Sequence, residues 1–352
     1  MIPMRNRKKT LEVTIEEMRN FSFAYIEKYA PSKQQLRTYL LKKYLNEIIL
    51  NSDNSTVYII DNNSSDESIL YVRDNYKEVK IISLDKNYGF AEGYNKGLKE
   101  VEEDYVCIIN NDILVTKDWL DPIRKKFKKH PESIIQPNIL DIKNNEYFEY
   151  AGASGGFIDK YGYPFCRGRI FDTLEKDNGQ YNDSKIFWAS GACFFISKTI
   201  FYKIGGFDKS FFAHMEEIDL CWRAFNLGYN SYSVTSSKVF HVGAATIKKD
   251  SRKTYLNYRN SLIMITKNIP LKSLLSTLLI RLILDIIASL KFLFQGEFSN
   301  FMSVYKAHIE YFYSLKSILR ARNNSINQAN YFKINSIVYK YFILGKKKFF
   351  QL

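Results

Sequence analysis

The fold is decided by Glu216-Glu217-Ile218-Asp219-Leu220-Cys221-Trp222-Arg223, which follows the turn Gly205-Gly206-Phe207-Asp208. Apolar residues recur at the spacing of one helix face and predict a helix that packs inward, at Ile218, Cys221, Trp222 and Phe225. Gly228 is placed to end this helix. Glu216 and Glu217 lie in its first turn, outside the apolar stripe. They can face a cleft, or they can merely complement the positive end of the helix dipole.

Two apolar runs elsewhere end abruptly in polar clusters and predict buried strands that lead into loops. Val57 to Ile60 ends at Asp61, and Tyr105 to Ile109 ends at Asn110-Asn111-Asp112. Ligands of open α/β sheets bind at the carboxyl ends of the strands, so these polar residues are candidates for a site. The alternative is that each acid only caps its own loop, because turns are rich in Asp and Asn.

Between these two runs lies a glycine-rich segment, Asn87-Tyr88-Gly89-Phe90-Ala91-Glu92-Gly93-Tyr94-Asn95-Lys96-Gly97, which follows a third short strand at Val79 to Leu84. Glycine allows tight turning and a close approach of the backbone to a ligand. The spacing of these glycines differs from the dinucleotide-binding fingerprint.

In order, these segments resemble family 2 of the nucleotide-sugar glycosyltransferases, which have the GT-A fold. The resemblance rests on Asp61, Asn87 to Asn95, Asn110 to Asp112, Ser190 to Cys193, Gly205 to Arg223 and His241, and it covers about residues 42–320. The stretch Tyr147 to Gly152 resembles the rhamnosyltransferase-like members that build bacterial surface polysaccharides. The implied fold is α/β, a Rossmann-like and mostly parallel sheet flanked by helices.

The resemblance implies an inverting glycosyltransferase that moves a sugar from a nucleotide-diphosphate sugar to a hydroxyl of a polysaccharide or lipid-linked glycan. Glu217 would act as the general base, with Glu216 beside it. Asp112 and His241 would hold a divalent cation, Mg²⁺ or Mn²⁺, that offsets charge on the leaving diphosphate; a lone His is more often structural. The implied donor-binding residues are Asp61, Asn87, Gly89, Gly93, Asn95, Asn110, Asn111, Trp188, Gly191 and Ala192.

The charge of the chain is unevenly distributed. The net charge is +14, and residues 246–352 hold 18 Lys and Arg against 4 Asp and Glu, which accounts for the whole excess. Leu274 to Phe294 is long and apolar enough to span a bilayer, but it carries Arg281, Asp285 and Lys291. We therefore expect an amphipathic helix on an anionic membrane surface, with an ordinary packed helix as the alternative. The apolar content disfavours nucleic acid as the partner.

Cysteine usage and the N-terminus indicate the compartment. The four cysteines lack metal-ligand spacing, and no apolar segment of a secretory signal follows the basic residues 1–10. We expect a cytoplasmic protein that is peripheral on the inner face of the cytoplasmic membrane.

The expected pattern breaks near the N-terminus. Family members begin with a strand and a Tyr-Asn or Trp-Asn turn, whereas here Phe21 to Ile26 is followed by Glu27-Lys28, and residues 15–45 show helical spacing. Ala24 to Lys43 weakly resembles the first helical module of RecX-type regulators. The predicted domains are therefore a helical segment at 1–45, a catalytic domain at 46–250 and a basic helical extension at 251–352. Two alternatives remain open: a catalytically impaired nucleotide-sugar-binding remnant without its first strand, and a nucleic-acid-associated protein.

Overall fold

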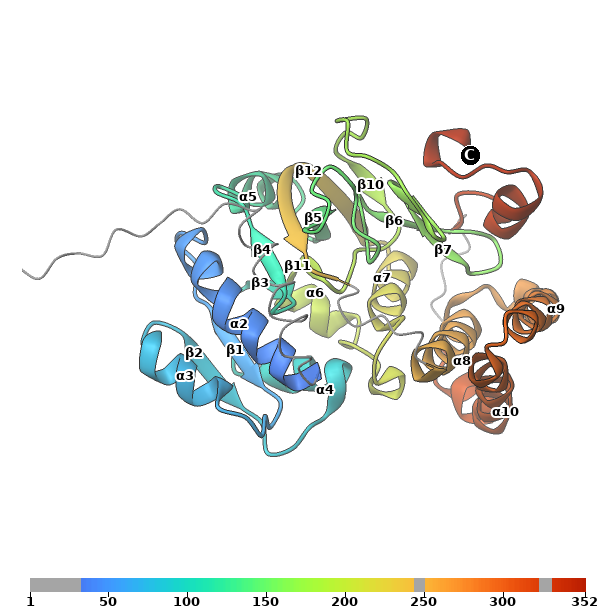
Figure 1. Cartoon of the computed structure of the whole chain (residues 1–352), viewed down its shortest axis with the longest axis horizontal. Helices are drawn as coiled ribbons and strands as arrows, with labels where there is room; N and C mark the ends of the chain where they lie inside the picture. The colour runs from blue at the N-terminus through green and yellow to red at the C-terminus, as the bar shows by residue number, and fades with distance from the viewer. Residues whose placement is uncertain (1–32, 244–250, 323–330) are drawn as a thin grey trace, which may run out of the picture.

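A computed structural model describes residues 33–243, 251–322 and 331–352 of the chain. Figure 1 shows a central sheet, a small α/β unit with α2, α3 and α4 on one side of it, and the helices α8, α9 and α10 on the other. The predicted α/β class is confirmed.

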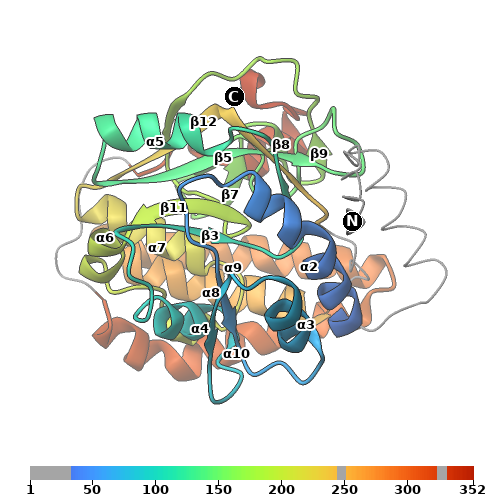
Figure 2. The same cartoon turned by 90° about the vertical axis from the view of Figure 1, so that its left-hand side faces the viewer.

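The central sheet has the strand order β10-β12-β5-β11-β3, with β4 pairing β12 outside this path. Figure 2 shows β5, β11 and β3 one below another. The sheet is mixed rather than mostly parallel: β5 and β12 run parallel, whereas β11 is antiparallel to both β5 and β3. Its strands are β3 (Tyr105–Ile109), β4 (Ile113–Val115), β5 (Ser133–Asp141), β10 (Ser184–Ile186), β11 (Cys193–Ser197) and β12 (Asn230–His241).

Side-chain alternation in β11 separates the core into two layers. Phe194 and Ile196 join one buried cluster, together with residues of α6 (Lys198–Lys203), α7 (Glu216–Asn226) and α8 (Ser251–Asn268). Phe195 joins a second cluster with residues of α5 (Leu120–Lys129) on the other face. Burial of each such phenylalanine stabilises the fold by about 1.5–3 kcal/mol.

A separate two-stranded parallel sheet carries the first predicted loop. It consists of β1 (Tyr58–Asp61) and β2 (Lys80–Ser83), with the helices α2 (Lys33–Leu50), α3 (Ser68–Asn75) and α4 (Gly89–Gly97) around it. The helix predicted from residues 33–45 is present as α2. Among the described residues β1 pairs only with β2, and β3 only with β11. The rest of the predicted helix, with Phe21 to Ile26, lies outside the described residues, so the prediction of a missing first strand stays a prediction.

A four-stranded antiparallel sheet is covered by the C-terminal residues. Its strands are β6 (Gly156–Ile158), β7 (Pro164–Cys166), β8 (Arg169–Ile170) and β9 (Thr173–Leu174). Phe165 and Ile170 of this sheet form a buried cluster with Ile337. In Figure 1 the end of the chain lies next to β6 and β7.

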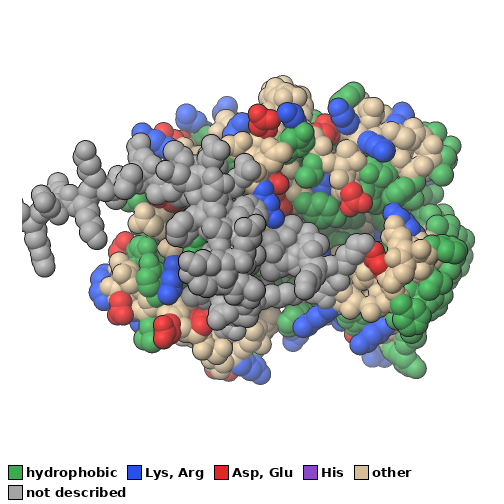
Figure 3. Space-filling view, in the orientation of Figure 1, with side chains coloured by type: hydrophobic (Ala, Val, Ile, Leu, Met, Phe, Trp, Pro, Cys, Tyr) green, Lys and Arg blue, Asp and Glu red, His purple; other side chains and the backbone are tan. Residues whose placement is uncertain are grey.

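Three helices follow β12, and the first differs from the other two. The second half of α8 is buried, whereas α9 (Leu271–Phe294) and α10 (Phe298–Arg320) expose long rows of apolar side chains. The hydrophobic side chains on the right-hand edge of Figure 3 lie where Figure 1 shows these two helices.

Candidate active site

The two predicted catalytic carboxylates lie at the first turn of α7, which begins at Glu216. Phe212, His214 and Met215, just before it, all have positive φ angles, which is uncommon for residues other than glycine. Glu217 lies against the Ser190-Gly191-Ala192 segment: a Cβ added to Gly191 would stand 3.6 Å from the Glu217 carboxyl carbon. The structure therefore brings together the start of α7 and the Gly191 segment.

Glu216 is buried, and Glu217 is half-buried. One oxygen, Oε2, of each of Glu216 and Glu217 is buried and has no hydrogen-bond partner among the described residues. Burial raises the pKa of Glu217 against the lowering effect of backbone N–H groups, including that of Gly191. Burial also raises the pKa of Glu216 well above its usual range, and the charge of Glu217 raises it further. A carboxylate with a raised pKa is well suited to accept a proton.

The predicted metal residues meet at the end of β12. His241 pairs with Ile113 at the start of β4, which places the imidazole beside Asp112. His241 Nε2 lies 3.1 Å from Asp112 Oδ1, and Nδ1 lies 3.3 Å from Glu149 Oε2. Burial lowers the pKa of His241, but the Asp112 and Glu149 carboxylates outweigh it and hold that pKa well above its usual value.

These residues alone do not form a closed metal cage. Within the described part of the chain, no group of three or more His, Cys, Asp and Glu side chains is arranged to hold a metal ion. What the structure shows is an imidazole between two carboxylates.

The glycine-rich segment forms the entry to α4, and its polar groups are largely bound to one another. Asn87 Oδ1 accepts the Gly89 N–H at 2.9 Å, while Asn62 accepts the Tyr88 N–H and donates to the Gly89 carbonyl, both at 2.8 Å. Gly89 has φ +75°, and a Cβ there would stand 2.9 Å from the Phe212 ring. Glycine is therefore required at 89 by both backbone conformation and close approach. A Cβ added to Gly93 would stand 3.1 Å from Asn62 Nδ2.

Asn95 has a structural task. Its side chain donates to the Phe207 carbonyl at 2.7 Å and accepts the Phe207 N–H at 2.9 Å. It thereby ties α4 to the Gly205–Asp208 turn. Its amide is bound to the protein backbone, and its predicted contact with a nucleotide stays a prediction.

The remaining predicted residues lie in different settings. Asp61 Oδ1 accepts the Ser64 N–H at 2.9 Å, as a loop-capping acid does. The Asn110 N–H donates to Ala192 O at 2.9 Å, which joins the polar triplet to the Gly191 segment, and Asn111 is exposed beside it. Trp188 is 2% exposed and donates its indole N–H to Phe157 O at 2.9 Å, so it lies in the core.

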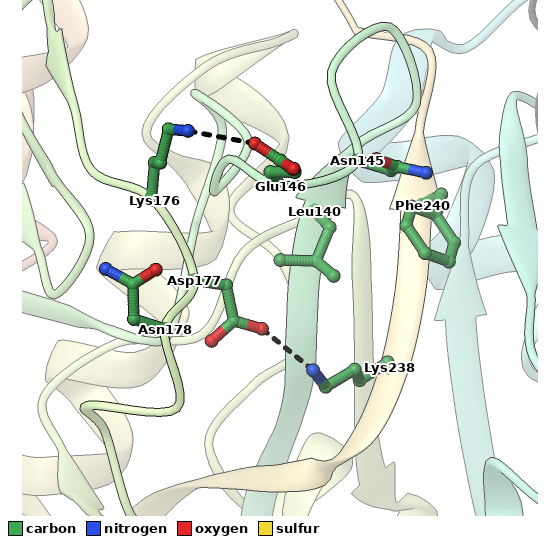
Figure 4. Close-up of a pocket in the computed structure, with 8 residues that line it drawn as sticks. All are labelled: Leu140, Asn145, Glu146, Lys176, Asp177, Asn178, Lys238 and Phe240. Carbon is green, nitrogen blue, oxygen red and sulfur yellow. Dashed lines mark hydrogen bonds and ion pairs between the residues drawn. The ribbon is translucent and has the colours of Figure 1, made fainter.

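Two hollows of the described surface are lined by other residues than Glu216, Glu217, Asp112 and His241. The first has a volume of about 430 Å³. Figure 4 shows its lining, in which Lys176 pairs with Glu146 and Lys238 with Asp177. Phe240 lines it, and neighbouring strand residues point to opposite faces, so this hollow lies across the sheet from His241. A second hollow of about 450 Å³ lies around Arg223 and Lys267.

Two site residues, Glu149 and Asn62, were missed in the sequence. Glu149 stands in an aromatic stretch, and its side chain meets His241 only because β5 pairs with β12, with Asp141 opposite His241. Asn62 follows the predicted Asp61 directly, so the polar cluster itself could have indicated it.

Comparison with known proteins gives a family and a fold. The sequence matches the profile of glycosyl transferase family 2 over residues 1–205. The match takes in residues 1–42, which sequence patterns left outside the resemblance, and ends before Glu216.

Two relatives illustrate the similarity. The chain is 26% identical over 209 residues to the low-salt glycan biosynthesis hexosyltransferase Agl10 of Haloferax volcanii, an alignment that spans 57% of this chain and 64% of that protein. It is 22% identical over 227 residues to N-acetylglucosaminyl-diphospho-decaprenol L-rhamnosyltransferase of Mycobacterium tuberculosis, covering 60% and 74%.

The fold resembles that of GalNAc-T7, solved with UDP, GalNAc and Mn²⁺, with a TM-score of 0.51 and 14% identity over 65% of this chain and 46% of that one. This likeness supports the GT-A fold.

Proposed function

Because the chain belongs to glycosyl transferase family 2, we propose that it transfers a sugar from a nucleotide-diphosphate sugar to a hydroxyl group, with inversion at the anomeric carbon. The observation that carries this proposal is the Glu217 carboxylate against Gly191, one oxygen of which is buried and unpaired among the described residues. In a single displacement the acceptor hydroxyl attacks the anomeric carbon and must lose its proton. A carboxylate whose pKa is raised by burial is suited to accept it.

Glu217 is the general base, and Glu216 tunes it. Glu216 is buried beside Glu217, and the pKa of each is raised by burial. Two neighbouring carboxylates repel each other when both are ionised, so a proton on Glu216 keeps Glu217 free to ionise.

The residues around His241 fit a divalent cation. If Nδ1 of His241 carries the proton toward Glu149, then Nε2 and Asp112 Oδ1 face each other at 3.1 Å as two lone-pair donors. Such a pair requires a proton or a cation between them, and a carboxylate that orients the far nitrogen is a common partner of metal-binding His. Asp112 and His241 would hold Mg²⁺ or Mn²⁺, with phosphate and water oxygens completing the coordination. The cation would offset charge on the leaving diphosphate.

The acceptor is a glycan or a lipid-linked glycan, and the protein lies on the inner face of the cytoplasmic membrane. One helix in the described part of the chain, Leu271–Phe294, is long and apolar enough to cross a membrane. The two charges in the middle of this helix point inward: Arg281 and Asp285 are buried and contact Tyr161 and Tyr163. Lys272 and Lys291 are exposed near its two ends, and the outward face between them is apolar, which suits a peripheral helix. The Mycobacterium tuberculosis relative, whose name specifies a diphospho-decaprenol acceptor, supports such an acceptor.

A catalytically impaired remnant is the second candidate function. It is favoured by the unpaired edges of β1 and β3 among the described residues. Backbone N–H and C=O groups without partners along a strand weaken the fold. A missing strand beside them would also leave the nucleotide pocket incomplete.

The test is a panel of nucleotide sugars offered to the purified full chain, with and without Mn²⁺. Release of nucleoside diphosphate that requires both a lipid-diphosphate acceptor and an intact Glu217 supports the enzyme. Donor binding without turnover or hydrolysis under any condition supports the remnant.

A further inference from the structure

The turn that precedes the catalytic helix holds an unfavourable backbone conformation. Phe212, His214 and Met215 have φ angles of 59°, 70° and 72°, and Glu216 follows directly. Residues other than glycine pay free energy to occupy this left-handed region, so the surroundings must enforce the conformation. A change in the backbone conformation of this turn would displace the first residues of α7.

The side chain of Asn260, which lies outside the turn, binds three backbone carbonyl groups of the turn. Asn260 of α8 is fully buried, and its Nδ2 donates to the carbonyls of Phe211, Ala213 and His214 at 2.9, 2.9 and 2.8 Å. An amide NH₂ has two hydrogens, so the three carbonyls share them. Three carbonyls can converge on one donor only when the backbone curls around it, as the positive φ angles allow.

The amide of Asn260 is itself fixed in orientation. Arg259 Nη1 donates to Asn260 Oδ1 at 2.9 Å, which leaves Nδ2 directed at the turn. The same guanidinium donates to Ser210 O and pairs through Nε with Glu310 of α10 at 2.9 Å. Asn260 and Arg259 belong to α8 and Glu310 to α10. Both helices lie beyond residue 205, where the family match ends.

We propose that Asn260 is a positioning residue of the reaction. It holds the turn at 211–215 in the conformation that places the Glu217 carboxyl against Gly191. The inference rests on the proposed function, because it assigns Asn260 a task only if Glu217 is the base. Asn260 touches none of the reacting atoms.

A matched control lies at the other end of α7. Asn226 is also a buried amide between α7 and α8, and its Nδ2 donates to Asn268 O at 3.3 Å. Asn226→Ala therefore removes a comparable inter-helix contact far along α7 from Glu217. A purely structural role of Asn260 predicts that both alanine variants behave alike.

The experiment compares kcat and donor KM of the full chain, corrected for the folded fraction. Asn260→Ala is expected to lower kcat by about 10–100-fold, because small displacements of a reacting group have effects of this size. Its donor KM should stay within about twofold of wild type, since the donor contacts are kept. Asn226→Ala should lower the melting temperature without lowering kcat.

A rescue variant tests the cause directly. Glycine occupies positive φ readily, so His214→Gly should restore part of the lost kcat in the Asn260→Ala background. If Asn260→Ala does not fold, Asn260→Gln keeps the amide but displaces it, and the same loss of kcat is expected.

Unchanged kcat in a folded Asn260 variant, or an equal loss in Asn226→Ala, overturns the inference. Wild-type protein without transfer activity overturns the proposed function instead.

Discussion

Replacement of Glu217 by glutamine should abolish turnover and leave donor binding intact. Backbone N–H groups, including that of Gly191, favour the Glu217 carboxylate, and the carbonyl oxygen of glutamine can still accept them. The amide nitrogen takes the place of Oε2, which has no hydrogen-bond partner among the described residues. The shape of the site is therefore preserved, and what is lost is the ability to accept a proton.

The size of the effect follows from this. Loss of a general base lowers the rate by about 10²–10⁴-fold, which corresponds to about 2.7–5.5 kcal/mol in the activation free energy. The loss should appear in kcat, because the interaction is needed only as the proton is transferred.

The same substitution should stabilise the fold, and increasingly so as the pH rises. Burial raises the pKa of Glu217 above its ordinary value of 4.5, so the folded state favours the protonated carboxyl. The stability that this group contributes is complete below 4.5 and is lost as the pH passes the raised value. Glutamine cannot ionise, so the melting temperature of Glu217→Gln should gain on that of wild type as the pH rises above 4.5.

The assays are nucleoside diphosphate release, donor titration by calorimetry and thermal melts across this pH range. Glu216→Gln is the control: it should share the gain in stability and keep more of the activity. Turnover of Glu217→Gln within about tenfold of wild type would refute the assignment of the base. A dead Glu216→Gln beside an active Glu217→Gln would exchange the two roles.

Three further outcomes are expected. Asp112→Asn should weaken Mn²⁺-dependent donor binding by at least about tenfold, and equal calorimetric affinities in saturating Mn²⁺ would exclude Asp112 as a ligand. Leu275→Glu with Leu279→Glu on the exposed face of α9 should release the protein from anionic liposomes, since each burial is worth about 1.5–3 kcal/mol; flotation unchanged from that of the control Leu227→Glu would place the contact elsewhere. Burial raises the pKa of Asp159 to about 6, so its contribution to stability is lost as the pH rises through that value. Proteolysis of residues 331–352 should therefore increase from about pH 5 to about pH 7 in wild type and change less in Asp159→Asn.

Deletion of residues 270–352 would remove buried core residues as well as the exposed apolar face, so point substitutions test membrane binding more directly. Tyr311 and Ile318 of α10 belong to the main core cluster, and Ile337 fills the cluster over β7 and β8. A truncated chain would lose core packing along with its apolar face, and loss of membrane binding could then follow from unfolding.

Local patterns predicted the elements well where neighbours in sequence set the structure. The run Tyr105 to Ile109 is strand β3 with the predicted bounds, and α7 ends just before Gly228, which has φ +89°. Apolar runs and helix-ending glycines act over a few residues, so the sequence contains the information directly.

Contacts between distant segments could not be predicted in this way. Asn95 was expected to face a nucleotide, but its amide binds the backbone of Phe207, 112 residues away. The partner of His241 at Nδ1 is Glu149, which lies in the stretch Tyr147 to Gly152 but was not expected at the site. Both contacts depend on strand order and helix placement, which no local spacing encodes.

The distribution of charge changes near residue 245, but the helices on either side of this point pack against one another. Helix α8 belongs by composition to the basic extension, yet it is the element that α7 and α10 share. Its Asn268 donates to Asp219 of α7 at 2.7 Å, and its Thr266 and Thr254 bond Tyr311 and Asn300 of α10 at 2.7 and 2.9 Å. Asn260 of the same helix binds the turn before Glu216. Helix α8 therefore contacts both the apolar helix α10 and the turn that leads to Glu216 and Glu217. A fragment ending at residue 250 would keep every motif of the family resemblance and lose the helix whose Asn260 we propose positions Glu217.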